Sequence, residues 1–290
     1  MFKIFNKSHH SSLKNMGFAV ELHKDYCNDH IEKHSVETVL LSFVVKGDGK
    51  HYLQDNVYDE KPGNISITHY DQVHSITSSS IDIYNIFVDP QFHPLPILPG
   101  KLQDILSEII PLHPNFYHKN NSIIRFQLKD IDGMMKLLDQ ISEECKSPGE
   151  GHYEMMRLYL KVFLMRLCRE YMEQVKDSTP RRHSHPMEKV RTFIDDHYFQ
   201  ELNLPTLAKK VHMHPNSLSR SFKAHTGASF SDYLCSRRLQ AAMIQLRTTN
   251  EKVLHIALNS GFQDISRFNK AFKQHIGETP RSYRKKFIRE

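Results

Sequence analysis

A motif that occurs twice in the last third of the chain constrains the fold more than any other sequence feature. Residues 222–227 read FKAHTG and residues 272–277 read FKQHIG, and a tyrosine follows each glycine by six positions, as Tyr233 and Tyr283. The two copies are offset by 50 residues. Because an internal repeat indicates repeated structural units, the motif predicts two copies of one small helical unit joined by a spacer.

A short helical pattern precedes each copy of the motif. Residues 207–211 carry it in the first copy and residues 256–262 in the second. Each pattern leads through a tight turn into the helix that ends at the repeated glycine, which is the arrangement of a helix-turn-helix. Good helix formers fill residues 229–247 between the units. At 1.5 Å per residue this spacer helix would be roughly 25 to 30 Å long.

The second helix of each predicted unit has one apolar face and one polar face. Leu218 and Phe222 in the first unit, like Phe268 and Phe272 in the second, lie four residues apart and are predicted to face the core. The residues predicted to face outward are Asn216, Ser219, Arg220 and Lys223 in the first unit and Ser266, Arg267, Asn269, Lys270 and Lys273 in the second.

Charge is divided unevenly along the chain. Residues 181–290 contain 20 Lys and Arg against 9 Asp and Glu, a net +11, whereas residues 1–177 contain 19 against 24, a net −5. The basic part is the part that contains the repeat. Such an asymmetry is expected of a segment that binds a polyanion, because each neutralised phosphate releases condensed counterions. A solvated basic surface is the alternative on charge alone.

Before the basic part, residues 39–86 alternate between strand and turn patterns. Apolar and β-branched runs at 39–45, 51–53, 57–58, 65–68, 74–76 and 81–87 are separated by turn signals at 47–49, 55–56 and 61–64. This pattern predicts a small antiparallel barrel or jelly roll. Helices are predicted at 101–110, after Asp130 or Asp132, and at about 153–174. The fold class is therefore α+β, with a β-barrel and helices first and an all-α part second.

The predicted helix at 153–174 carries an apolar stripe, which has two interpretations. The stripe packs on the barrel, or it pairs with another helix in a homodimer, and both hold if the stripe is wide enough. After this helix the chain is polar and interrupted by proline, which predicts an interdomain linker. We therefore expect domains at 1–175 and 186–290, with the linker at 176–185.

Several classes of protein are disfavoured by composition. No run approaches the ~18 apolar residues of a membrane span, and the polar start of the chain is unlike a secretory signal, so a cytoplasmic protein without membrane contact is expected. The four cysteines have no paired spacing, which disfavours disulfides and a cysteine zinc site. Twenty histidines are spread along the whole chain. We expect no cofactor and no bound metal.

The repeat region resembles the AraC/XylS family of transcription regulators. The resemblance lies in residues 261–262 (GF), 268–273 (FNKAFK), 279–280 (TP) and 283–284 (YR), together with Gly277. The first unit agrees at 207–208, 218–223 and Gly227, and the match covers about residues 187–286.

The resemblance implies that the two second helices enter successive major grooves on one face of double-stranded DNA. Arg can fork onto guanine, Asn onto adenine, and Ser or Lys can bind phosphate. His214, where the family more often has a small capping residue, and Asn269, where Ser is common, depart from the pattern. By resemblance the DNA contacts are Asn216, Ser219, Arg220, Lys223, Ser266, Arg267, Asn269, Lys270 and Lys273.

The first domain resembles the cupin fold at residues 47–49, 61–64 and His74. Enzymatic cupins hold a metal with a His-x-His pair, an acid and a later His. His34, Glu37 and His74 match three of these roles, but residue 32 is Glu, so the set is incomplete. In such regulators this domain binds an effector and dimerises. We expect a small polar effector, with a sugar as the candidate, at Tyr52, Tyr58, His74 and Tyr84; a packed interior is the alternative.

Taken together, these features predict a sequence-specific transcription regulator, with activation favoured and RNA polymerase as a further partner, that is not an enzyme. One alternative is a metal-dependent cupin enzyme fused to a DNA-binding module. Another is an architectural protein that binds DNA with little sequence preference.

Overall fold

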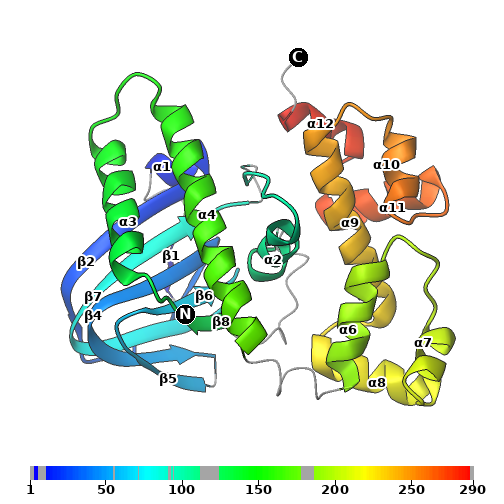
Figure 1. Cartoon of the computed structure of the whole chain (residues 1–290), viewed down its shortest axis with the longest axis horizontal. Helices are drawn as coiled ribbons and strands as arrows, with labels where there is room; N and C mark the ends of the chain where they lie inside the picture. Colours follow the sequence, from blue (N-terminus) through cyan, green and yellow to red (C-terminus); the bar gives the residue numbers. More distant parts are fainter. Residues whose placement is uncertain are drawn as a thin grey trace. The chain divides into compact units, whose positions relative to one another are not determined.

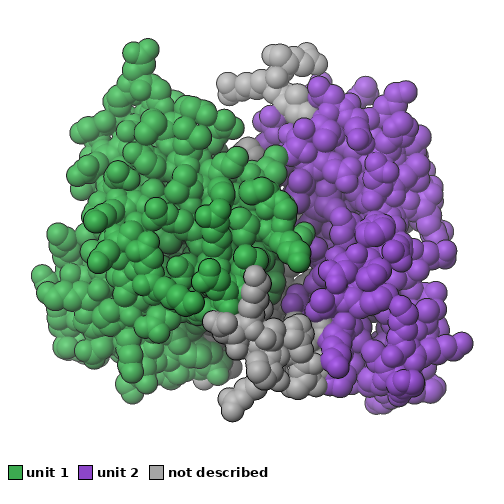
Figure 2. Space-filling view, in the orientation of Figure 1, with its two compact units in different colours: residues 1–114, 122–176 green, residues 115–121, 177–290 purple. Residues whose placement is uncertain are grey.

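The computed structural model describes residues 3–5, 11–54, 56–70, 72–90, 93, 95–111, 124–177 and 186–287. Contacts divide these residues into two compact units, the first ending at Lys176 and the second beginning at Asp177 (Figure 2). Lys176 and Asp177 are the last residues of a long helix. The rest of the predicted linker, residues 178–185, lies outside the described residues, so the linker remains a prediction.

The first unit contains one eight-stranded sheet with the order β1-β3-β7-β4-β6-β8, in which β2 also pairs with β7 and β5 with β4. The pair β1 and β3 is parallel and the other pairs are antiparallel. The predicted antiparallel sheet domain is confirmed. The strands are β1 (Lys3–Phe5), β2 (Phe18–Asn28), β3 (His34–Val36), β4 (Val39–Leu53), β5 (Asn56–Glu60), β6 (Asn64–Thr68), β7 (His74–Val88) and β8 (Ile124–Gln127).

The turn predicted at residues 47–49 is wrong, because β4 runs through it as one strand of 15 residues. Gly47 has a φ of 78°, and a Cβ there would lie 2.2 Å from the carbonyl oxygen of Ser80 on β7. The pairing of β4 with β7 shifts register on both sides of Gly47. The glycine therefore makes a β-bulge that brings two backbones close without ending the strand. The strands predicted separately at 74–76 and 81–87 are likewise one strand, β7.

The turn predicted at residues 61–64 is confirmed. The backbone N–H of Asn64 donates to the carbonyl of Lys61 at 3.0 Å, and Gly63 has a φ of 90°, a value that glycine adopts without strain. At the turn predicted at 55–56, Leu53 pairs with Asn56 across the hairpin, and Asp55 lies outside the described residues.

Helices cover one face of the sheet (Figure 1). Tyr84, Phe43, Ile65 and Phe126 lie opposite one another on β7, β4, β6 and β8 and so share this face. The Tyr84 hydroxyl donates to Asp139 at 2.5 Å, and the Phe126 ring lies 5.3 Å from the ring of Tyr171. These contacts fix the last two helices of the unit against the sheet. The helices are α1 (Ser11–Met16), α2 (Lys101–Ile109), α3 (Ile131–Lys146) and α4 (His152–Asp177).

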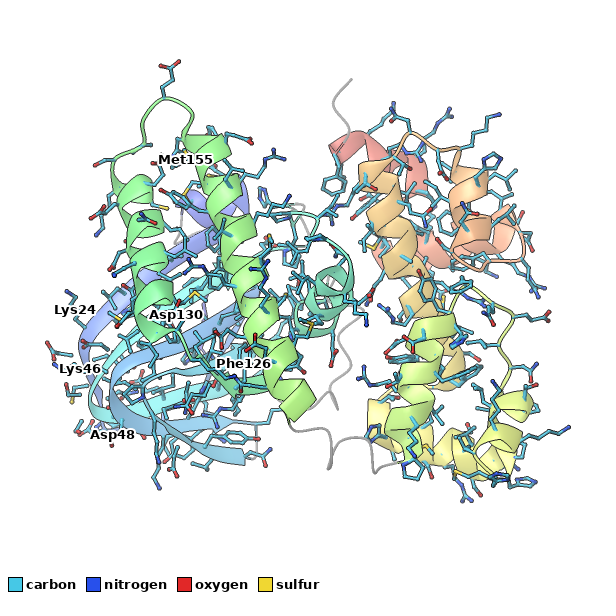
Figure 3. All side chains as sticks on the ribbon, in the orientation of Figure 1. Lys24, Lys46, Asp48, Phe126, Asp130 and Met155 are labelled. Atoms are coloured by element: carbon cyan, nitrogen blue, oxygen red, sulfur yellow. The ribbon has the colours of Figure 1, made fainter. Side chains whose placement is uncertain are left out.

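The start of α3 and the buried face of α4 match the sequence pattern. Asp130 caps α3 by accepting a hydrogen bond from the N–H of Gly133 at 2.9 Å (Figure 3). The packing interpretation of the α4 stripe is confirmed, since Met156, Leu160, Phe163, Leu164, Leu167 and Tyr171 are all buried. A second stripe on α4 is exposed and contains Met155, Leu158 and Val162 (Figure 3 labels Met155).

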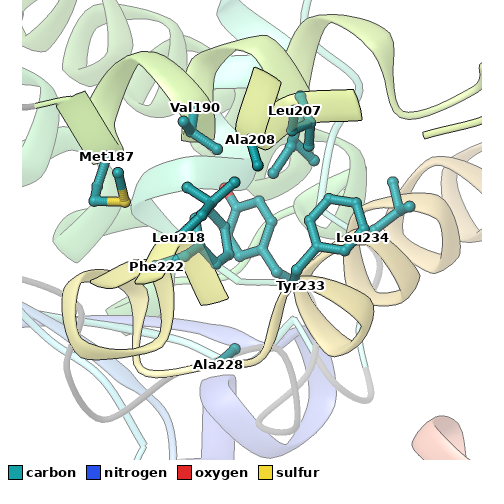
Figure 4. Close-up of a cluster of buried hydrophobic side chains, with 11 residues drawn as sticks. Met187, Val190, Leu207, Ala208, Leu218, Phe222, Ala228, Tyr233 and Leu234 are labelled. Atoms are coloured by element: carbon teal, nitrogen blue, oxygen red, sulfur yellow. The ribbon is translucent and has the colours of Figure 1, made fainter. Parts of the chain in front are cut away.

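The second unit is all helical, as predicted. A cluster of buried side chains from its first four helices includes Val190, Leu207, Leu218, Phe222 and Tyr233 (Figure 4). These side chains match the apolar faces that the sequence indicated. The helices are α6 (Pro186–His197), α7 (Leu204–Lys210), α8 (Pro215–Thr226), α9 (Phe230–Thr248), α10 (Val253–Asn259), α11 (Ile265–Ile276) and α12 (Pro280–Phe287).

Most helix ends of the second unit follow the predicted capping residues. Gly227 and Gly277 end α8 and α11 with φ values of 78° and 84°, and Asn203 caps α7. Asparagine is a favoured capping residue, so the sequence predicts Asn250 as the cap of the helix that contains Val253 and Ile256, and this prediction is wrong. Helix α10 begins at Val253, so the cap position is Lys252, which makes no side-chain capping bond. Asn250 lies two residues too early for its side chain to reach the first free N–H groups of the helix.

Candidate nucleic-acid interface

The two helix-turn-helix units share one turn geometry. In the first, the N–H of Met213 donates to the carbonyl of Ala208 at 2.9 Å; in the second, Phe262 donates to Ala257 at 3.0 Å. The residue before each donor has a positive φ, 51° at His212 and 91° at Gly261. Each turn thus ends its first helix with a left-handed residue, and the N–H of the next residue satisfies a terminal carbonyl of that helix.

The second helices, α8 and α11, are each 12 residues long and are offset by 50. Their caps differ in strength. His214 accepts from the N–H of Asn216 through Nδ1 at 3.3 Å, whereas Asp264 accepts from the N–H of Arg267 at 2.8 Å. A carboxylate also interacts favourably with the positive end of the helix dipole. The turns are offset by 49 and the caps by 50, so the second turn has one additional residue.

The predicted DNA-contact residues lie on the solvent side of these two helices. Eight of the nine are exposed and Ser219 is half-buried. The supports behind them match in both helix-turn-helix units at two places, because Phe222 and Phe272 are fully buried and Gly227 and Gly277 end the helices. The outward residues differ between the copies. The two faces therefore present different hydrogen-bonding groups on equivalent supports.

Arg267 already has partners in the residues just before its own helix. Its guanidinium donates to the side-chain carbonyl of Gln263, and its Nε lies 3.4 Å from Asp264 Oδ2. The side chain is 71% exposed, and surface ion pairs of this kind contribute only about 0 to 1 kcal/mol. The pair therefore leaves Arg267 able to turn toward an anionic ligand at small cost.

The spacer helix α9 connects the units. Its 19 residues span about 28 Å at 1.5 Å per residue, which is of the order of one turn of DNA, about 34 Å. Near the start of α9, Tyr233 packs in the cluster of buried side chains shown in Figure 4. Near the end of α9, the Arg247 guanidinium lies 5.3 Å from the ring of Phe287 on α12. One rigid element is thus built into both units.

In the sheet domain, which is the first of the two compact units, a row of polar side chains crosses the face of the sheet opposite α3 and α4. Asn85, Ser42, Ser66 and Arg125 lie opposite one another on β7, β4, β6 and β8. Ser42 donates to Asn85 at 3.1 Å, and Arg125 Nε donates to Ser66 at 2.9 Å. The Arg125 guanidinium also lies 4.5 Å from the ring centre of Tyr58. This polar face is held in place by hydrogen bonds across four strands.

Glu60 accepts three hydrogen bonds and forms one ion pair at the end of this row. Its Oε1 accepts from Ser66 and His51, each at 3.0 Å, and its Oε2 lies 2.8 Å from Arg125 and 3.2 Å from Asn64 Nδ2. Burial by itself raises the pKa of this carboxyl, but the hydrogen bond from His51 and the charge of Arg125 outweigh it and lower the pKa. Glu60 is therefore a buried, ionised carboxylate.

Two buried histidines extend the chain of hydrogen bonds from Glu60. His51 Nε2 lies 3.2 Å from His74 Nδ1. Burial lowers the pKa of both histidines, so both are neutral. Because the carboxylate only accepts, His51 carries its proton on Nδ1, its Nε2 accepts from His74 Nδ1, and His74 Nε2 is left as an acceptor. Among the described residues, this buried Nε2 has no hydrogen-bond partner.

The four predicted effector residues do not share one face of the sheet. His74 belongs to the buried chain, and Tyr58 pairs with His51 beside it. Tyr84 instead contacts α3, and Tyr52 adjoins His51 on β4 and so points to the opposite face. His51, Glu60 and Arg125 were not predicted. The register of β4 with β5 and the pairing of β8 with β6 are the information that brings them together.

The histidines of the incomplete cupin set are only partly brought together. The rings of His34 and His74 lie 4.3 Å apart, and the two residues pair across β3 and β7. Among residues placed by the structure, no three His, Cys, Asp or Glu side chains form a group that could hold a metal ion. No helix in the described ranges is long and apolar enough to cross a membrane.

An antiparallel sheet domain followed by two helix-turn-helix units is the architecture of a DNA-binding regulator with a sensor domain. Two family models match the chain. A model described as an AraC-like ligand binding domain matches residues 20–160, and one described as a helix-turn-helix domain matches residues 207–286. The chain belongs to the AraC/XylS family of DNA-binding transcription regulators and has its N-terminal ligand-binding domain.

Curated relatives agree with this assignment. The HTH-type transcriptional activator RhaR of Mannheimia succiniciproducens is 21% identical over 291 residues, which is 100% of both chains. The XylDLEGF operon transcriptional activator 3 of Pseudomonas putida is 27% identical over 57% of this chain and 52% of its own length. An uncharacterised HTH-type regulator of Staphylococcus aureus is 22% identical, and the match spans 86% of this chain and 32% of that protein.

The chain is also similar to solved structures. ToxT from Vibrio cholerae is 15% identical and aligns over 94% of this chain and 99% of its own, with a TM-score of 0.38. The C-terminal domain of AraT from Geobacillus stearothermophilus is 29% identical over 36% of this chain and 88% of its own, with a TM-score of 0.35.

Proposed function

We propose that this regulator is an activator that reads a two-part DNA site with α8 and α11 and responds to a small polar effector at the sheet unit. The observation that carries the DNA part is the pair of supports with matching buried anchors and different outward faces. Equivalent supports place both faces in the same way, so the difference between the faces becomes a difference between the half-sites. Arg220 and Arg267 supply forked donors for guanine, and Asn216 and Asn269 supply amides for adenine.

An exchange of faces tests this proposal. The offset of 50 pairs residues 216, 217, 219 and 220 of α8 with 266, 267, 269 and 270 of α11. The variant N216S/S217R/S219N/R220K gives α8 the outward residues of α11. In selection from random DNA, we expect one half of the enriched motif to change toward the sequence of the other half. A motif identical to that of the wild type would overturn the assignment of these residues. Lys223→Gln is the matched control. Because positions 223 and 273 are both lysine, Lys223 does not distinguish the two faces, and the halves of the motif should stay as they are in the wild type.

The effector is proposed to donate a hydrogen bond to His74 Nε2. This buried acceptor is the end of a chain that begins at the Glu60 carboxylate, so it can be satisfied only by a donor such as a hydroxyl or an N–H. A sugar presents several hydroxyls and is the favoured class. Tyr58, which lies beside the chain, is the predicted second contact.

Thermal-shift and calorimetric screening of the full chain against sugars and amino sugars tests the effector. We expect a hit that stabilises the wild type and not His74→Phe, which keeps a ring but loses the acceptor. Tyr84→Phe, on the helix-covered face, is the control and should keep the response. A hit that binds both variants equally would place the effector elsewhere.

The exposed stripe of α4, at Met155, Leu158 and Val162, is proposed as the homodimer contact. Its spacing of three and four residues is that of a helix-pairing seam. Light scattering should give a dimer for the wild type and a monomer for Leu158→Lys. Transcription in vitro with RNA polymerase tests activation, the activity for which RhaR and the XylDLEGF regulator are named. Repression of the template by the bound protein would contradict it.

A further inference from the structure

Arg238 lies in the middle of the spacer helix α9. It binds the backbone that follows α6, the first helix of the helical domain. Its Nε donates to the carbonyl of Tyr198 and its terminal nitrogen donates to the carbonyl of Gln200, each at 2.8 Å. These carbonyls come just after the end of α6, where helix carbonyls lack intrahelical partners. The planar guanidinium holds its donors in a fixed fork and can satisfy both at once, whereas the single ammonium of a lysine lacks that fork. Arg238 therefore fixes the corner after α6 to the spacer.

The neighbouring Arg237 makes a different connection. Its Nε lies 2.8 Å from Asp195 on α6, and Asp195 also accepts from the Tyr233 hydroxyl at 2.9 Å and lies 3.2 Å from Arg191. All of these groups belong to α6 and α9 within the first helix-turn-helix unit. Arg237 thus holds α6 to the spacer helix through these contacts, and none of them involves the second helix-turn-helix unit.

Gly261 brings the second helix-turn-helix unit to the same corner. It is the left-handed residue of the second turn, with a φ of 91°. A Cβ on Gly261 would lie 2.7 Å from the Tyr198 carbonyl oxygen, 2.9 Å from Arg238 Nε and 2.9 Å from the Cα of Phe199. The oxygen that accepts from Arg238 is thus the one against which the second turn packs. Only a residue without a side chain permits this approach.

We infer that Arg238 and Gly261 form a junction that sets the base-pair spacing between the two halves of the DNA site. The inference rests on the proposed two-part reading. The turn at Gly261 leads directly into α11, so the corner that holds Gly261 also positions that helix relative to α8. One added base pair moves a half-site by about 3.4 Å along the duplex and, at 10 to 10.5 base pairs per turn, by about 35° around it. A fixed junction cannot follow that displacement. Arg238 is a positioning residue and needs no contact with DNA.

Binding of the full chain to sites of altered spacing tests the junction. Fluorescence anisotropy would compare the selected site with sites that have one base pair added or removed between the halves. We expect the wild type to lose about tenfold or more in affinity on either altered site, because one half-site loses its base contacts. Arg238→Gln should lose only a few-fold, and Arg238→Lys, which keeps the charge but not the fork, should fall between them. Salt dependence should equal that of the wild type, since no phosphate contact is removed.

Arg237→Gln is the matched control. It removes the ion pair with Asp195 and the contact of the guanidinium with the Tyr198 ring, whose centre is 5.6 Å away. It removes neither hydrogen bond of Arg238, so it should keep the wild-type spacing ratio. If Arg238→Gln, folded by circular dichroism, keeps the wild-type ratio, the junction does not set the spacing. If the wild type binds isolated half-sites as well as the whole site, the two-part reading itself fails. Loss of spacing discrimination in the Arg237 variant alone would assign the role to the α6 attachment instead.

Discussion

Acidification should destabilise the first unit through its buried histidines, and His69 gives the effect a magnitude. The side chain is 2% exposed and its Nε2 donates to the carbonyl of Ile109 at 2.8 Å. Burial lowers the pKa of His69 from 6.5 to about 4, although the bond to Ile109 opposes the shift. In the unfolded chain the same imidazole titrates near its ordinary pKa of about 6.5.

Between these two values the unfolded state binds the extra proton, so the free energy of unfolding falls as the pH falls through this window. At about 1.36 kcal/mol per unit of pKa, the loss from His69 between pH 8 and pH 5 is about 2 kcal/mol. His51 and His74 have lowered pKa values for the same reason and add losses of the same sign. Above pH 7 all three are neutral in both states, and the contribution is constant.

Hydrogen exchange of peptides from β4 and β7, read by mass spectrometry at several denaturant concentrations, measures unfolding of this unit at each pH. His69→Gln keeps a donor for Ile109 but does not titrate, so it should remove about 2 kcal/mol of the pH dependence. His30→Gln changes an exposed side chain and is the control. An unchanged pH dependence in His69→Gln would refute the reasoning.

Three further predictions concern the second unit. Arg220→Ala and Arg267→Ala should each weaken specific DNA binding by about 1 to 3 kcal/mol in anisotropy titrations, and equal losses on random DNA would contradict the arginine roles. Lys285→Ala should mainly reduce the slope of log affinity against log salt concentration, by about one. His212→Gly should stabilise by about 0.5 to 1 kcal/mol in thermal unfolding, because left-handed backbone costs a side chain about 1 to 2 kcal/mol and glycine entropy returns part of that. Tyr233→Phe should cost about 1 kcal/mol in the same assay; no change would show that its hydroxyl bond is not stabilising.

The sequence was sufficient for the second unit because its signals are local and occur twice. Gly227, Gly277 and Asn203 act within a few residues of the helix ends they cap, so residue type and position predict them. The junction is different. Nothing near Arg238 in the sequence shows that its guanidinium reaches carbonyls 38 to 40 residues earlier.

The sheet unit was predicted in kind but not in register, since strand pairing is non-local. A Gly-Asp-Gly run signals a turn, yet at Gly47 it forms a bulge because β7 is long enough to continue pairing on both sides. Strand β2 was missed, because only its first residues are apolar and its second half is mostly exposed. The link from His51 to Glu60 depends on the same register and could not be seen without it.

We propose that one chain carries two different DNA-reading helices on a single spacer. Selection from random double-stranded DNA with the full-length wild type tests it most directly. The structure leads us to expect an enriched motif of two dissimilar halves whose centres lie about one helical turn, 10 to 10.5 base pairs, apart. Recovery of DNA with no enriched motif would contradict sequence-specific reading and favour an architectural role, and two identical halves would contradict the difference between the helices.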